Sequence, residues 1–123
     1  MIKKEITENG ITVIFDSIEN ISTCSLGVFV KTGSKDEHSD EDGISHVLEH
    51  MIFKGTDKRN YFEISEEVDY LGASINAHTS KEETVFYINS LSEYIYKSSD
   101  ILFDIVTNSL FDEKELEKEK DVI

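Results

Sequence analysis

The chain has 123 residues, enough for one domain with one hydrophobic core, and its apolar (38%) and charged (31%) fractions are ordinary for a globular protein. Its 26 acidic and 12 basic residues give a formal net charge of -14, which argues against binding to nucleic acids or anionic membranes because both require a basic surface. A single cysteine, Cys24, excludes an internal disulfide and fits a reducing compartment, so we expect a cytoplasmic protein.

The N-terminal third of the chain predicts a hairpin followed by a longer strand. Residues 2–7 and 11–15 are separated by Asn9-Gly10, a dipeptide that favours the tight turn of a hairpin. Residues 22–32 are rich in strand-forming side chains. Residues 33–43 are polar and acidic with glycine at both ends, which predicts a loop.

Helices and strands alternate in the remainder. Gly55 and Gly72 each follow an apolar periodic segment and are expected to end a helix. We expect helices over 44–54, 61–71 and 92–110 and from 113 onward, and strands over 73–78 and 83–91. This mixed order predicts a single α+β domain over residues 1–123, a two-layer sandwich with helices packed on one face of a mostly antiparallel sheet.

The helix expected over 44–54 carries the pattern of a zinc site. His46 and His50 are four residues apart and therefore lie one turn apart on one helix face, and zinc binds neutral imidazole nitrogens. Glu49 flanks that face, and the pattern H-x-x-E-H pairs two ligands with a carboxylate that can take a proton from metal-bound water. The alternative is that both histidines are hydrogen-bonded helix residues beside a solvated glutamate.

Other titratable residues give weaker signals. His38 lies in the acidic loop, and we expect it to be solvated; His78 lies on the strand expected over 73–78, where we expect it to face water. Glu119 shares a helical stripe with Leu116 and Ile123. A glutamate in that position is more often a helix-edge residue than a site residue.

Four segments together resemble the pitrilysin family of zinc metallopeptidases, in particular its processing-peptidase branch, whose bacterial members look like the mitochondrial processing peptidase β subunit. The segments are Gly33-Ser34, residues 46–56 (HVLEHMIFKGT), residues 71–83 and residues 116–123. They occur in the order of the family and span nearly the whole chain. The resemblance implies a zinc endopeptidase in which His46 and His50 bind Zn²⁺, Glu49 is the general base, and Glu119 is an acidic residue near the metal.

The resemblance also implies how substrate is held. Asn76 and Ala77 match part of the edge strand on which these enzymes bind an extended peptide through main-chain hydrogen bonds. We therefore expect the strand over 73–78 at an exposed sheet edge beside the motif helix, with both residues facing the cleft.

The family's third zinc ligand is a glutamate about two helical turns beyond Glu119, past Ile123, and its site also takes an arginine and a tyrosine from a second homologous half or partner subunit. The resemblance thus implies that residues 1–123 are the N-terminal part of a zinc-binding peptidase domain, truncated before the third ligand. Two alternatives are a catalytically inactive fragment and a non-catalytic peptide-binding or structural subunit; a homo-oligomer is left open.

Overall fold

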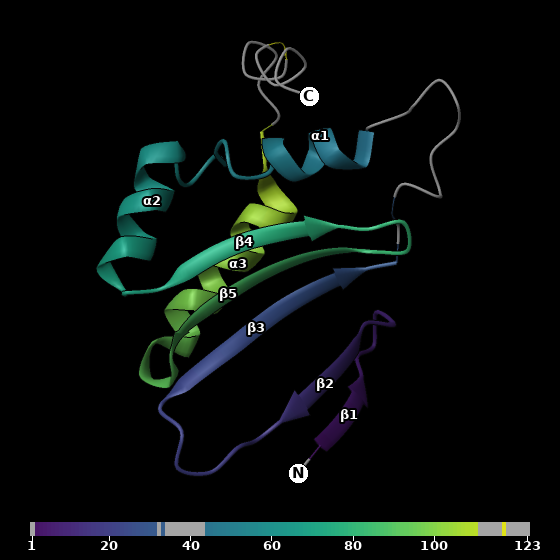
Figure 1. Ribbon diagram of the computed structural model, residues 1–123, viewed down its shortest axis with the longest axis vertical. Coiled ribbons are helices and arrows are strands. Elements are labelled where there is room, and N and C mark those ends of the chain that lie inside the picture. The colour runs from purple at the N-terminus through teal and green to yellow at the C-terminus, as the bar shows by residue number, and fades with distance from the viewer. Residues whose placement is uncertain (1, 32, 34–43, 111–116, 118–123) are drawn as a thin grey trace.

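The computed structural model describes residues 2–31, 33, 44–110 and 117, and for residues 44–46 it describes the backbone only. In these residues the elements are β1 (Ile2–Ile6), β2 (Thr12–Asp16), β3 (Thr23–Val30), α1 (Ile44–Met51), α2 (Tyr61–Tyr70), β4 (Ser74–Thr79), β5 (Thr84–Leu91), the 3-10 turn η3 (Ser92–Tyr94) and α3 (Ile95–Asn108) (Figure 1). Of the helix expected from 113 onward, only Glu117 is described, in helical conformation.

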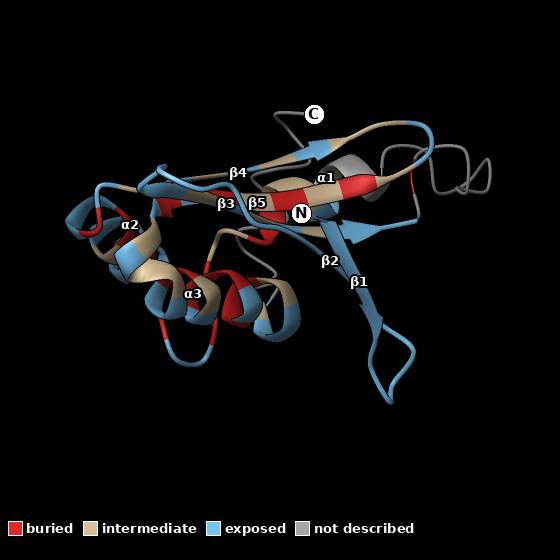
Figure 2. Cartoon of the chain, turned by 90° about the horizontal axis from the view of Figure 1, so that it is seen from below, coloured by how far each residue is buried: buried red, intermediate tan, exposed pale blue. Residues whose placement is uncertain are grey.

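The main sheet has three antiparallel strands in the order β3-β5-β4. β5 is central, so β4 is an edge strand within the described part of the chain. β1 and β2 form a separate antiparallel hairpin, and every residue of these two strands is exposed. Helices α2 and α3 lie on one side of the three-stranded sheet (Figure 2), so the predicted α+β architecture is confirmed.

The hydrophobic core lies between the sheet and these two helices. β5 alternates strictly, with the side chains of Thr84, Phe86, Ile88 and Ser90 buried, as expected for a central strand with one covered face. The core cluster consists of Ile52, Ile64, Val68, Leu71, Phe86, Ile88, Ile101, Leu102 and Ile105. Among the described helices, none is long and apolar enough to cross a membrane.

Local signals set the ends of α2. Asn60 caps its first turn in a capping box: the Asn60 side chain accepts from the backbone N–H of Glu63, and the Glu63 side chain accepts from the backbone N–H of Asn60. Gly72 ends the helix with a φ of 64°, and the amides of Gly72 and Ala73 donate to the carbonyls of Asp69 and Val68. This is a Schellman ending, so the predicted helix stop at Gly72 is confirmed.

The predicted end of α1 is wrong. The helix ends at Met51 rather than Lys54, and a turn follows in which the amide of Lys54 donates to the carbonyl of Met51. Gly55 has a φ of 145° and forms an isolated β-bridge with Asn60 instead of capping the helix. The extended backbone at Gly55 therefore belongs to the loop between α1 and α2.

Candidate functional site

The H-x-x-E-H pattern lies on α1, with His46, Glu49 and His50 at helical backbone positions. Glu49 and His50 are half-buried, Leu48 is 45% exposed and Met51 is fully buried. α1 therefore ends in a fully buried side chain and leaves Glu49 and His50 partly accessible. The side chain of His46 is outside the described residues, so the convergence of the two imidazoles stays a prediction.

The donor set on α1 fits zinc chemically, because two imidazoles one helical turn apart are ligands that this ion prefers. The described residues contain no group of three or more His, Cys, Asp or Glu side chains that could hold a metal ion. A complete zinc site therefore requires at least one ligand from outside the described part of the chain. Glu119 lies in that undescribed part, and its role stays a prediction, as does the solvation of His38.

β4 lies directly beside α1 (Figure 1). It pairs with β5 on one side, and no described strand pairs with its other side, so the expected edge position is confirmed. His78 on β4 is exposed, as expected. The substrate-binding role of this strand stays a prediction.

The register shows which main-chain groups point toward the open edge of β4. The amide of Ser80 donates to the carbonyl of Glu83, so that pair is hydrogen-bonded across the turn. Hydrogen-bonded and non-hydrogen-bonded pairs alternate in an antiparallel ladder. The pairs Ile75↔Ile88, Ala77↔Phe86 and Thr79↔Thr84 are therefore the non-hydrogen-bonded ones. The N–H and C=O groups of Ile75, Ala77 and Thr79 consequently point away from β5.

Asn76 and Ala77 direct their side chains to opposite faces of β4, and the expectation that both residues face the substrate cleft stays a prediction. Neighbouring residues on a strand point to opposite faces, and Asn76 is exposed while the Ala77 methyl packs against the core cluster. What Ala77 presents at the edge is its backbone. The Asn76 side-chain oxygen accepts the Ala77 N–H at 2.8 Å, so a peptide added to this edge would compete with Asn76 for that donor.

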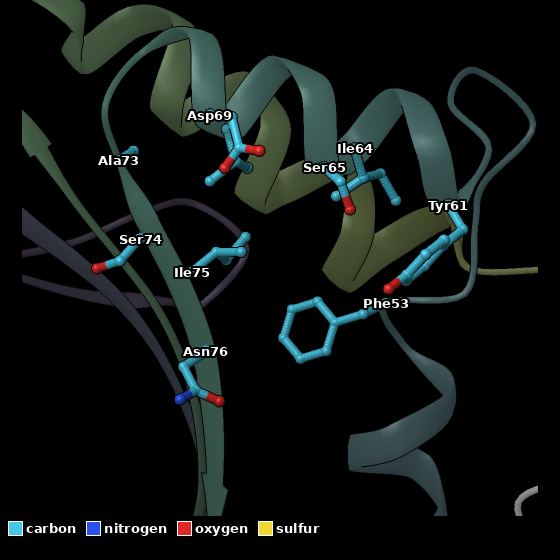
Figure 3. A pocket seen from close by; sticks show the side chains of 10 residues that line it. Phe53, Tyr61, Ile64, Ser65, Asp69, Ala73, Ser74, Ile75 and Asn76 are labelled. Atoms are coloured by element: carbon cyan, nitrogen blue, oxygen red, sulfur yellow. The ribbon is translucent and has the colours of Figure 1, made fainter.

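A cavity that sequence reasoning missed opens between α2 and β4, with a volume of about 430 Å³ (Figure 3). Phe53, from the turn after α1, points into it together with Tyr61 and Ile75. Its lining residues are Phe53, Tyr61, Ile64, Ser65, Val68, Asp69, Ala73, Ser74, Ile75 and Asn76. The sequence signal was weak, because each of these apolar residues is also an ordinary core residue. The cavity adds an apolar recess beside the open edge strand.

The sequence pattern of the insulinase family (peptidase family M16) matches residues 12–123. The chain belongs to this family. Pitrilysin-type membership, expected from the four motif segments, is thereby confirmed. In this M16 chain, the H-x-x-E-H residues lie on helix α1, directly beside the edge strand β4.

Individual relatives agree with this membership. The chain is 42% identical over its whole length to the "Uncharacterized zinc protease YmxG" of Bacillus subtilis. It is 44% identical over 94% of its length to the mitochondrial-processing peptidase subunit beta of Saccharomyces cerevisiae. The crystal structure of a protease from Helicobacter pylori superimposes on 99% of the chain with a TM-score of 0.92 and 28% identity.

The M16 chain spans only a part of these relatives: 30% of the Bacillus protein, 25% of the yeast subunit and 30% of the Helicobacter protease. The remaining 70% or more of each relative has no counterpart in the 123 residues. Any activity, substrate or partner of a whole protein is therefore a matter of proposal for this chain.

Proposed function

We propose that this chain is the N-terminal part of a zinc-dependent endopeptidase that hydrolyses peptide bonds in extended peptides. The observation that carries the proposal is the placement of Glu49 and His50, both half-buried on α1, beside the open edge of β4. Family membership and the name of the Bacillus subtilis relative, a zinc protease, support it. The acidic composition and the single cysteine are consistent with a cytoplasmic enzyme that acts on peptides rather than on nucleic acids or membranes.

In the proposed mechanism His46 and His50 hold the metal. Bound zinc would supply a Lewis acid that polarises the scissile carbonyl and lowers the pKa of water. Glu49 then accepts a proton from the attacking water and passes it to the leaving amine. Glu119 would support the metal site from the helix expected after α3.

β4 would hold the substrate by strand addition. The outward N–H and C=O groups of Ile75, Ala77 and Thr79 repeat along the edge and match the main chain of an extended peptide. This arrangement selects for extended segments, because only a segment whose main-chain N–H and C=O groups are unpaired on one side can be added to the edge. The Asn76 side chain must release the Ala77 amide as the peptide binds.

The 123-residue chain alone should be inactive. The H-x-x-E-H motif supplies two histidine ligands, whereas a catalytic zinc site usually has three protein ligands. We propose that the third ligand lies in the chain beyond Ile123 and that a second homologous half or subunit completes the site. The yeast relative's name, which calls it a subunit, supports this reading.

A reconstitution experiment tests the proposal. The whole protein, of a length like that of its relatives, is stripped with a chelator and assayed on an unstructured peptide before and after addition of one equivalent of Zn²⁺. We expect turnover to disappear and return, while the 123-residue chain shows none under either condition. A whole protein that cleaves equally well without metal would contradict the proposal. One that binds zinc but never cleaves would favour the non-catalytic peptide-binding alternative.

A further inference from the structure

The loop between α1 and α2 contains a buried arginine. Arg59 is only 3% exposed, and its guanidinium binds carboxylates from two helices. Nη1 donates to Asp104 at 2.8 Å and Nη2 to Asp100 at 2.6 Å, both on α3, and Nε donates to Glu67 on α2. Burial alone would lower the pKa of Arg59, but these three carboxylates raise it above its usual value. The guanidinium of Arg59, which is always charged, thereby fixes the loop between α1 and α2 to both α2 and α3.

A threonine hydroxyl completes this contact. Thr56 is 4% exposed, and its Oγ1 donates to Asp104 Oδ2 at 2.8 Å while accepting the backbone amides of Arg59 and Lys58 at 3.0 and 3.2 Å. Burial would raise the pKa of Asp104, but hydrogen bonds from Thr56, Asn108 and Arg59 hold it below its ordinary value. Thr56, Arg59 and Asp104, which we call the Arg59 junction, thus keep a buried carboxylate charged and satisfied.

The residues that follow α1 are also bonded to those that follow α3. The amide of Leu110 donates to the carbonyl of Gly55 at 3.0 Å, and Ser109 Oγ donates to the carbonyl of Ile52 at 2.8 Å. Thr56 and Ser109 form an isolated β-bridge. The chain leaving α3 is therefore held against the end of α1, next to the Arg59 junction.

The proposed metal site needs groups from both segments. His50 precedes Ile52 by two positions, and Leu110 leads into the segment with Glu119. We propose that Arg59 is a positioning residue of the metal site: through Thr56 and Asp104 it fixes the end of α1 relative to the chain that leaves α3. This inference rests on the proposed zinc peptidase function. Arginine is required because its rigid fork reaches three carboxylates at once, whereas lysine offers one point charge.

Two variants of the whole protein weaken the junction and two matched variants leave it intact. Arg59→Lys removes the fork, and Thr56→Val removes the hydroxyl at nearly constant volume. Thr56→Ser keeps the hydroxyl, and Ile101→Val loosens the fully buried face of α3 without touching the junction. Zinc affinity is measured by competition with a chromophoric chelator at a temperature at which every variant is folded. Hydrogen exchange of the Ile52 and Leu110 amides is measured on the metal-free protein.

We expect Arg59→Lys and Thr56→Val to weaken zinc binding by about tenfold, the lower end of the range for groups bonded directly to metal ligands, because the junction acts on α1 from further away. Both variants should accelerate exchange at both amides. Thr56→Ser and Ile101→Val should leave zinc affinity within about twofold of wild type, because neither changes the bonds of the junction. Unchanged zinc affinity in Arg59→Lys, with a lowered melting temperature, would show a purely structural role and overturn the proposal. If the wild-type protein binds no zinc, the proposed function fails, while the exchange rates still decide whether the junction ties α1 to the end of α3.

Discussion

Helices α1 and α3 differ in how far their side chains are buried. α3 is the best covered helix of the described chain, whereas on α1 only Met51 is buried among the described side chains, Glu49 and His50 are half-buried and Leu48 is 45% exposed. The buried residues of α3 are Ser98, Ile101, Leu102, Asp104 and Ile105. The difference indicates that α3 contributes more to the stability of the domain than α1, which leaves Glu49 and His50 partly exposed.

The largest expected effect is a loss of activity on α1. In the whole protein His50→Ala should lose zinc and lower turnover by more than about 100-fold, the upper figure for residues that only orient a metal ligand. The metal-free melting temperature should barely change, because His50 is only half-buried. His78→Ala is the matched control, since His78 is exposed on β4 and should leave zinc content unchanged. Stoichiometric zinc in His50→Ala would remove that residue from the metal site.

On α3 the expected effect is a loss of stability instead. Ile101 is fully buried in the core cluster, so Ile101→Ala should lower the free energy of unfolding of the 123-residue chain by about 2–5 kcal/mol. Urea denaturation followed by circular dichroism measures this change. A loss below about 1 kcal/mol would mean that α3 is not the stabilising helix that its burial indicates.

The ion pairs of Arg59 make stability depend on acid pH. Hydrogen bonds from Arg59 and Lys58 hold the pKa of Asp100 below its ordinary value of 3.8. For Glu67, burial opposes ionisation, but bonds from Lys97 and Arg59 outweigh it and lower its pKa below 4.5. A carboxyl group whose pKa is lower in the folded than in the unfolded chain stabilises the fold at pH values above its ordinary pKa. This contribution is lost as the pH falls through the lowered pKa of the folded state. The chain should therefore lose stability steadily below about pH 4.5.

Asp100→Asn sharpens this test. Asp100 is half-exposed, so the variant should be less stable at neutral pH by at most about 1 kcal/mol. It should also lose less stability on acidification, because it has one fewer carboxylate to protonate. Melting temperatures of both chains between about pH 7 and pH 3 measure the difference. Parallel curves for variant and wild type would contradict the assignment.

The smallest expected effect is again on α1. Leu48 is 45% exposed, so Leu48→Ala should change the free energy of unfolding by no more than about 0.5 kcal/mol. Urea denaturation of the 123-residue chain measures this change, in parallel with that of Ile101→Ala. A cost comparable to that of Ile101→Ala would erase the contrast between the two helices.

Local chemistry made much of the fold predictable. The Asn9-Gly10 hairpin, the helix stop at Gly72 and the strand β5 depend on residues close together in the sequence, and all three were expected. The H-x-x-E-H helix and the edge position of β4 were expected from motifs and from the family resemblance. That resemblance contributed what periodicity alone does not supply, namely roles for particular residues.

The Arg59 junction could not be predicted, because Arg59 meets Glu67, Asp100 and Asp104 at separations of 8, 41 and 45 residues. No periodic pattern marks such long-range pairs, and a charged residue in a polar loop is ordinarily solvated. Strand alternation places the side chains of Asn76 and Ala77 on opposite faces of β4. The family resemblance assigned both residues one shared role and did not distinguish these faces.

The most direct test of the central claim, that α1 carries a zinc-dependent peptidase site, is the zinc content and peptide turnover of Glu49→Gln in the whole protein, measured on one preparation. The amide cannot accept a proton, and Glu49 is assigned no metal bond. We expect one equivalent of zinc, as in wild type, with turnover reduced by about 100-fold or more, the range expected for loss of a general base. Turnover close to wild type, or loss of the zinc itself, would contradict the assignment.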